Sequence, residues 1–230
     1  MKYKVVITRA ICVLLASVML VLGCGNPAPE HAAKGDSYYA DKQWDEAIEE
    51  YTKAIEQDPN IAMAYNKRGA AYGKNGDYDK AVADFNKAIE LDPNFATAYN
   101  NRGDSYGKKG DYDKAIADLN KAIELDPNIT ITYSARGYAY AGRGDYDKAI
   151  TDYNRVIEAD PNYAVAYNNR GYAYAHQGHY EKAITDYNKA IELDPNYAAA
   201  YDNRGHAYAS IGDIDRAAAD EDKAKQLGLR

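Results

Sequence analysis

The chain has 230 residues, enough for one sizeable domain or an array of repeats, and it carries 28 basic against 35 acidic side chains. This acidic balance argues against a nucleic-acid-binding protein, because such binding depends on neutralising phosphates, and against adsorption of the folded part on anionic lipid. Tyrosine is unusually common, with 24 tyrosines beside 2 phenylalanines and 1 tryptophan, which favours a packing position that recurs along the chain.

The first segment, residues 1–23, has the pattern of a secretory signal. A basic start is followed by an apolar run from Ala10 to Leu22, which is shorter than the roughly 20 residues that a membrane span needs. The junction Leu22-Gly23-Cys24 resembles the lipobox of bacterial lipoproteins. That resemblance implies removal of residues 1–23 and lipidation of Cys24, whereas the alternative is an ordinary cleaved signal that leaves Cys24 as a free thiol.

Residues 24–34 follow as a polar segment with proline and glycine, and we interpret them as a lipid-anchored tether. The residue after the cysteine is Gly25. In proteobacterial lipoproteins an aspartate there commonly marks retention in the inner membrane. The resemblance therefore implies the bacterial cell envelope, and within it the outer membrane facing the periplasm.

From Ala28 onward the sequence repeats with a period of 34 residues. Glycine, tyrosine and alanine recur in phase, as at Gly69, Tyr72 and Ala81, and the tripeptide Asp-Pro-Asn recurs with its prolines at Pro59, Pro93, Pro127, Pro161 and Pro195. This pattern resembles the tetratricopeptide repeat (TPR). The resemblance implies an all-α fold of helix-turn-helix repeats, stacked into a right-handed superhelical solenoid of about six repeats. Repeats one to six would span 28–61, 62–95, 96–129, 130–163, 164–197 and 198–230.

The spacing within one repeat predicts the same helix pair. Tyr65, Gly69 and Tyr72 fall on one face of a first helix, and Gly76 is placed to end it in the left-handed conformation. Because glycine inside a helix costs about 1 kcal/mol relative to alanine, its recurrence indicates that a partner helix packs closely there.

Charged residues also recur at a fixed offset. The residue before the repeated glycine is arginine in repeats two to six, and an aspartate follows sixteen residues later, as in Arg136 and Asp152. Repeat one has Lys34 and Glu50 at these positions. The offset predicts a ladder of ion pairs between packed helices, and the alternative is that the charges are solvated separately.

No phosphate loop, nucleophile motif or carboxylate pair stands apart from the repeat, so we expect neither an enzyme nor a cofactor. His176 and His179 form an H-x-x-H sequence, with His206 thirty residues from His176. These histidines could bind a metal, or they could simply face solvent around a turn. A metal site needs three or four convergent ligands, and this favours solvent.

The remaining face of each first helix would line the concave groove. Here it carries asparagines at the fifth and sixth repeat positions, among them Asn101, Asn168, Asn169 and Asn203. The series resembles the asparagine ladder of the O-GlcNAc transferase TPR array, which implies amides that grip a peptide backbone. Lys67 and Ala135 interrupt it.

Four tyrosines outside the repeated positions cluster in repeats four to six. Tyr138 and Tyr172 occupy the ninth position, and Tyr163 and Tyr197 directly precede a first helix. They would either form an aromatic groove beside the asparagines or add packing between repeats.

The sequence therefore predicts a membrane-tethered adaptor that binds a protein or peptide partner of unknown identity, through Asn101, Tyr138, Tyr163, Asn168, Asn169, Tyr172, Tyr197 and Asn203. Two alternatives stay open. One is a periplasmic protein that binds a metal or ligand, and the other is a self-assembling structural array.

Overall fold

The computed structural model describes residues 27–229, and in that range the chain forms twelve α-helices and no strand. None of these helices is both long and apolar enough to cross a membrane. The predicted signal peptide at 1–23 and the predicted lipidation site Cys24 lie outside the described residues. The chain divides into two compact units, which meet in sequence between Leu91 and Asp92, and each unit is described by itself.

Unit 1 contains two helix pairs within residues 27–91. The helices are α2 (Ala28–Ala40), α3 (Trp44–Gln57), α4 (Ala62–Lys74) and α5 (Tyr78–Leu91), and each packs against the next. Helix α2 begins directly after Pro27, a residue suited to a helix N-terminus, and continues through an alanine-rich turn. Residues 28–34, which the tether prediction also included, are therefore helical.

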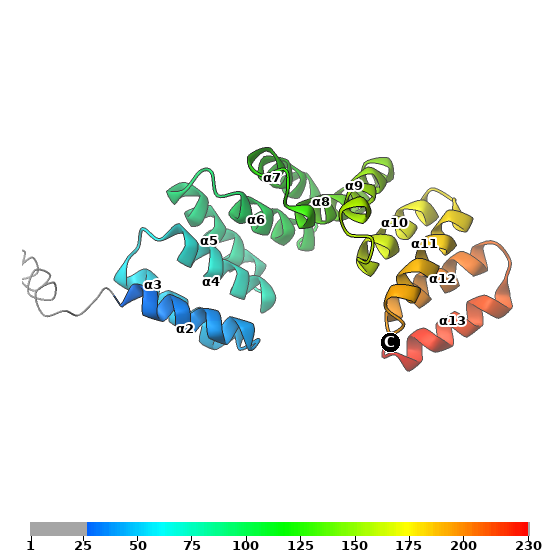
Figure 1. Ribbon diagram of the computed structural model, residues 1–230, viewed down its shortest axis with the longest axis horizontal. Helices are drawn as coiled ribbons and strands as arrows, with labels where there is room; N and C mark the ends of the chain where they lie inside the picture. The colour runs from blue at the N-terminus through cyan, green and yellow to red at the C-terminus, as the bar shows by residue number, and fades with distance from the viewer. Residues whose placement is uncertain (1–26, 230) are drawn as a thin grey trace, which may run out of the picture. The chain divides into compact units, whose positions relative to one another are not determined.

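Unit 2 contains four helix pairs. They are α6 (Ala96–Lys108), α7 (Tyr112–Leu125), α8 (Thr130–Arg143), α9 (Tyr146–Ala159), α10 (Ala164–His176), α11 (Tyr180–Leu193), α12 (Ala198–Ser210) and α13 (Ile214–Gln226). Figure 1 shows them in chain order, from the green α6 to the red α13. Each first helix packs on its own second helix, and the second helix packs on the first helix of the next pair. The prediction of an all-α fold built from helix-turn-helix repeats is confirmed.

The two helices of a pair approach closely at the repeated glycine. A Cβ atom added at Gly137 would lie 2.8 Å from the Tyr153 ring, and one added at Gly171 would lie 2.8 Å from the Tyr187 ring. No Cβ fits at such a distance, so the glycine is needed for packing, as its recurrence predicted. In repeats one to five, the alanine at the facing position of the second helix is fully buried, completing a core of small residues and large rings.

The turns also follow the repeat. Gly76 has a φ of 88°, so it ends its helix in the left-handed conformation that the sequence predicted. After the second helix of repeats one to five, the aspartate of Asp-Pro-Asn accepts a hydrogen bond from the backbone N–H of the asparagine, as between Asp160 and Asn162 at 3.0 Å.

The predicted ion pairs form in repeats two to six. In each, the arginine Nε and Nη2 atoms donate to the two carboxylate oxygens of the aspartate, at 2.6–2.8 Å. We call these five bidentate pairs the arginine ladder: Arg68–Asp84, Arg102–Asp118, Arg136–Asp152, Arg170–Asp186 and Arg204–Asp220. The hydrogen bonds that each arginine donates to its aspartate raise the pKa of that arginine.

The arginines also join neighbouring repeats. The remaining guanidinium nitrogen, Nη1, of Arg170 donates to Asn154 Oδ1 at 2.6 Å, on the second helix of the preceding repeat. Arg136 and Arg204 make the same bond to the corresponding asparagines, Asn120 and Asn188. Each of these arginines therefore ties three helices together.

The first repeat departs from the predicted pairing. Lys34 bonds to Glu30 at 2.9 Å, whereas Glu50 bonds to His31 and Lys53, each at 2.7 Å. The prediction of a Lys34–Glu50 pair was wrong. His31 stands where repeats two to six have a tyrosine, and its ring, in place of the Lys34 ammonium, bonds to the Glu50 carboxylate. These hydrogen bonds, led by the one from His31, lower the pKa of Glu50.

Candidate functional site

Unit 2 contains two neighbouring pockets along its first helices. The first has a volume of about 210 Å³, and Tyr112, Tyr138, Tyr153, Asn168, Asn169 and Tyr172 contribute to its lining. The second has a volume of about 190 Å³, and Tyr172, His176, Tyr187, Asn203 and His206 contribute to its lining. Tyr172 borders both, so we treat the two pockets together as the tyrosine groove.

Tyr138 and Tyr172 are the exposed tyrosines of this groove, with 48% and 41% of their surface accessible. Both occupy the ninth position of their repeat, on the first helix of the pair. Partial burial and the neighbouring tyrosines, Tyr146 first among them, raise the pKa of the Tyr172 hydroxyl, so the group stays protonated near neutral pH. Two large rings thus remain available on consecutive first helices.

Tyr163 and Tyr197 behave differently from the other two predicted tyrosines. Tyr163 packs against the buried core residues Tyr133, Val156 and Ala166. Tyr197 is half-buried, burial raises the pKa of its hydroxyl, and that hydroxyl shares a hydrogen bond with Asn168. Neither tyrosine lines the two pockets. The structure places both in packing contacts between repeats.

The asparagines of repeats five and six form a directed chain of hydrogen bonds. Asn203 Nδ2 donates to Asn168 Oδ1 at 2.9 Å, and Asn168 Nδ2 donates to Asn169 Oδ1 at 3.2 Å. Asn168 is only 5% exposed, so it acts as an internal link. The chain ends at the Asn169 Nδ2 group, which borders the first pocket and donates to no partner within residues 27–229.

The same chain is broken between repeats three and four. Asn100 Nδ2 donates to Asn101 Oδ1 at 3.3 Å, but the buried Asn100 Oδ1 atom accepts no hydrogen bond within the described residues. The residue in the place of Asn203 is Ala135, which has no amide to donate. Asn101 does not line either pocket.

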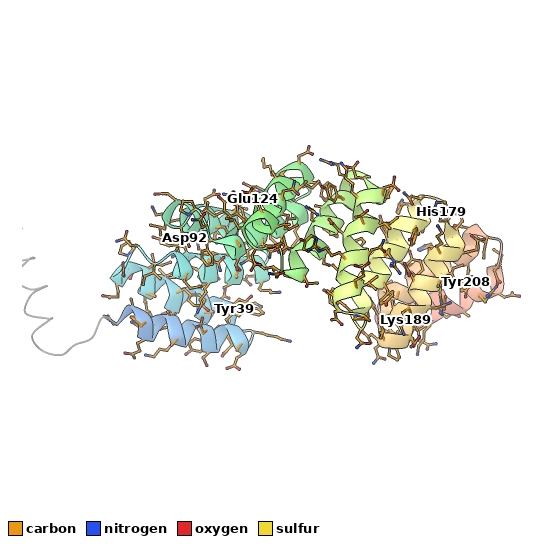
Figure 2. The ribbon with its side chains drawn as sticks, turned by 45° about the horizontal axis from the view of Figure 1, so that its top comes forward. Tyr39, Asp92, Glu124, His179, Lys189 and Tyr208 are labelled. Carbon is orange, nitrogen blue, oxygen red and sulfur yellow. The ribbon has the colours of Figure 1, made fainter. Side chains whose placement is uncertain are left out.

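The histidines contact different tyrosine rings. His176 stacks on Tyr146, with ring centroids 5.1 Å apart, and also contacts Tyr172 at 4.3 Å. His179 lies in the turn before α11, where Figure 2 labels it, with its ring edge-on to Tyr174. Residues 27–229 contain no group of three or more His, Cys, Asp or Glu side chains that could hold a metal ion.

Contributors to the groove that were not singled out from the sequence include Tyr112, Gly142, Tyr153 and Tyr187. Tyr153 and Tyr187 belong to the core, with 1% of each residue exposed, yet both also line the pockets. Repeats two and three have Phe85 and Leu119 at this position. The hydroxyl that tyrosine adds there in repeats four and five was the sequence feature that could have indicated a polar role. Gly142 replaces the lysine of repeats two and three, and Tyr112 occupies the space where its Cβ would be.

Family models match most of the described residues. Models described as tetratricopeptide repeat match residues 62–95, 96–129, 164–197 and 186–219, and a model described as TPR repeat matches 35–76 and 137–178. No protein of curated function matched the sequence.

Solved structures resemble the chain as well. A crystal structure of MamA is 31% identical, with a TM-score of 0.60, 69% of this chain and 93% of that chain being covered. The crystal structure of YrrB, described as a TPR protein with an unusual peptide-binding site, is 27% identical, with a TM-score of 0.60 and coverage of 77% and 92%. PilW, a type IV pilus biogenesis factor, shares the fold at 19% identity, with a TM-score of 0.80 and coverage of 88% and 94%. Together the repeat pattern, the helix pairs and these matches show that the chain belongs to the tetratricopeptide-repeat family.

Proposed function

We propose that this TPR protein is an adaptor of the bacterial cell envelope that binds a segment of a partner protein in the tyrosine groove of repeats four to six. Proteins of the family act as protein–protein interaction scaffolds. The observation that carries the choice of site is the exposure of Tyr138 and Tyr172 on consecutive first helices, each beside a pocket. Large, partly exposed aromatic rings commonly anchor protein interfaces, since they bury much area at little entropic cost.

The similarity to YrrB supports a peptide as the bound form, since YrrB is described as having a peptide-binding site. The groove of the present chain offers the matching chemistry. Asn169 presents an amide donor and the tyrosines present rings and hydroxyls, so the surface can bond backbone carbonyls and pack side chains together.

The envelope location rests on the sequence of the N-terminus. The lipobox-like Leu22-Gly23-Cys24 supports a lipid on Cys24, and Gly25 favours the outer membrane. An anchored adaptor of this kind would hold its partner next to the membrane.

A cross-linking experiment tests the groove. A photoreactive amino acid replaces Tyr172 in cells, and its matched control replaces Ile214, which is 64% exposed on the second helix α13. We expect one set of proteins to be captured from position 172 and not from 214. Equal capture from both positions would place the binding surface elsewhere.

A labelling experiment tests the anchor separately. The full chain expressed in a bacterial host should incorporate fatty acid and sediment with membranes, and Cys24→Ser should do neither. Equal labelling of both proteins would remove the lipoprotein assignment and leave the groove untouched.

A further inference from the structure

Within the tyrosine groove, the phenolic hydroxyls of Tyr153 and Tyr187 make no hydrogen bond to any other residue in the range 27–229. Each ring is 1% exposed, lies against a glycine of its first helix, and reaches a pocket lining. No residue of the described part of the chain accepts a hydrogen bond from either hydroxyl. Burial raises the pKa of both groups, so each remains a donor.

The equivalent tyrosine of repeat one has a different environment. Tyr51 is equally buried, but its hydroxyl donates to Asp36 Oδ1 at 2.8 Å. Asp36 stands at the ninth position of its repeat, where repeats four and five carry Tyr138 and Tyr172. In these two repeats the internal acceptor has been replaced by a ring, and the phenolic donor at the pocket wall is left for a ligand.

The chemistry of the groove favours a neutral ligand rich in acceptors. No lysine, arginine, aspartate or glutamate lines either pocket. An anion would find no lysine or arginine to pair with, and an apolar group would leave the hydroxyls and the Asn169 amide unbonded, which is costly. A polypeptide that presents carbonyl oxygens without N–H groups satisfies these donors, and proline is the residue that lacks the N–H.

The lining of the pockets points in the same direction. The first pocket lies between α8 and α10 and the second between α10 and α12, so they are one repeat apart with Tyr172 between them. Both are walled by tyrosine rings, and proline-rich segments in the polyproline II conformation dock in aromatic-lined grooves. A polyproline II helix has three residues per turn, so the same face recurs at every third residue.

We propose, on the basis of the adaptor function above, that the groove recognises a proline-rich segment in the polyproline II conformation. Prolines three residues apart would occupy the two pockets on either side of Tyr172. The hydroxyls of Tyr153 and Tyr187 and the amide of Asn169 would donate to the backbone carbonyls of the segment.

The test is calorimetric titration of the full chain with a capped oligoproline of three turns, beside a Gly-Ser peptide of equal length and a chito-oligosaccharide. Oligoproline should bind and the other two should not. Tyr153→Phe and Tyr187→Phe keep the rings and should each weaken binding about two- to tenfold, the effect of one hydrogen bond. The matched control Tyr51→Phe, whose hydroxyl already has an acceptor, should leave affinity unchanged.

Equal binding of oligoproline and the Gly-Ser peptide, or wild-type affinity in both groove variants, would overturn the proposal. Binding of the saccharide alone would reassign the groove to a glycan. The experiments distinguish a failure of the proline assignment from a failure of the adaptor function. If oligoproline does not bind but the partner captured at position 172 still requires Tyr172, the adaptor stands and only the proline assignment is wrong.

Discussion

In unit 2 the arginine ladder and the tyrosine groove both use residues of the first helices. The ladder residues are identical in every repeat, whereas the groove residues differ from one repeat to the next. At the ladder, each repeat has the same arginine, the same aspartate and the same bidentate geometry. At the groove, the ninth position is Asp104, Tyr138, Tyr172 and His206 in successive repeats. Positions that hold the helices together recur unchanged, whereas the surface that meets a partner varies from repeat to repeat.

The largest effect is expected from breaking the ladder on one side. Asp152→Ala leaves the Arg136 guanidinium, whose side chain is 19% exposed, without its carboxylate, and should cost about 3–5 kcal/mol of unfolding free energy. Replacing both residues, as Arg136→Leu with Asp152→Leu, should cost less, because no lone buried charge remains. Denaturant unfolding of Arg136→Leu, Asp152→Leu and the double variant measures the coupling between the two residues. Small, additive effects would show that the charges contribute independently.

Close helix packing gives the next effect. Gly137→Ala places a Cβ 2.8 Å from the Tyr153 ring and should destabilise the protein by about 1–3 kcal/mol. The matched control is Gly73→Ala, where the nearest side-chain atom would be 3.9 Å away and alanine should gain up to about 1 kcal/mol from helix propensity. Thermal unfolding should move in opposite directions for the two variants, and a shared direction would contradict the packing argument.

The fold and the ladder could be predicted from sequence because both depend on residue types at a constant offset. Repeat one differs from the others at three of these positions, which hold His31, Lys34 and Glu50, and there the histidine bonds to the glutamate while the lysine bonds elsewhere. The pockets could not be predicted, because they depend on where particular rings lie. Tyr112 enters the space left by Gly142, and the same residue type at positions 163 and 172 is packed in one case and exposed in the other.

The asparagine hydrogen bonds allow a comparison with smaller expected effects, between the complete chain in repeats five and six and the broken one in repeats three and four. Asn203→Ala should leave the buried Asn168 Oδ1 without its donor and cost about 1–3 kcal/mol. Ala135→Asn should supply the donor that Asn100 Oδ1 lacks and add about 0.5–1.5 kcal/mol of stability. Thermal unfolding of both variants measures this, and we expect the melting temperature to fall for Asn203→Ala and to rise for Ala135→Asn. A loss of stability in Ala135→Asn would mean that the amide does not reach Asn100.

The exposed groove tyrosines, Tyr138 and Tyr172, should contribute least to stability and most to partner binding. Tyr138→Ala combined with Tyr172→Ala removes two exposed rings and should change stability much less than truncation of the buried Tyr187, for which about 3–5 kcal/mol is expected. Each groove ring should nevertheless carry about 2 kcal/mol or more of partner affinity.

The central claim is therefore tested most directly by measuring the Tyr138→Ala, Tyr172→Ala double variant twice, once by thermal unfolding and once by its affinity for the partner captured at position 172. We predict a melting temperature close to that of the unsubstituted chain and a loss of partner affinity of at least a hundredfold, which is about 2.8 kcal/mol. Retained folding with unchanged affinity would contradict the assignment of the groove as the binding site, and unfolding of the variant would show that these tyrosines belong to the core.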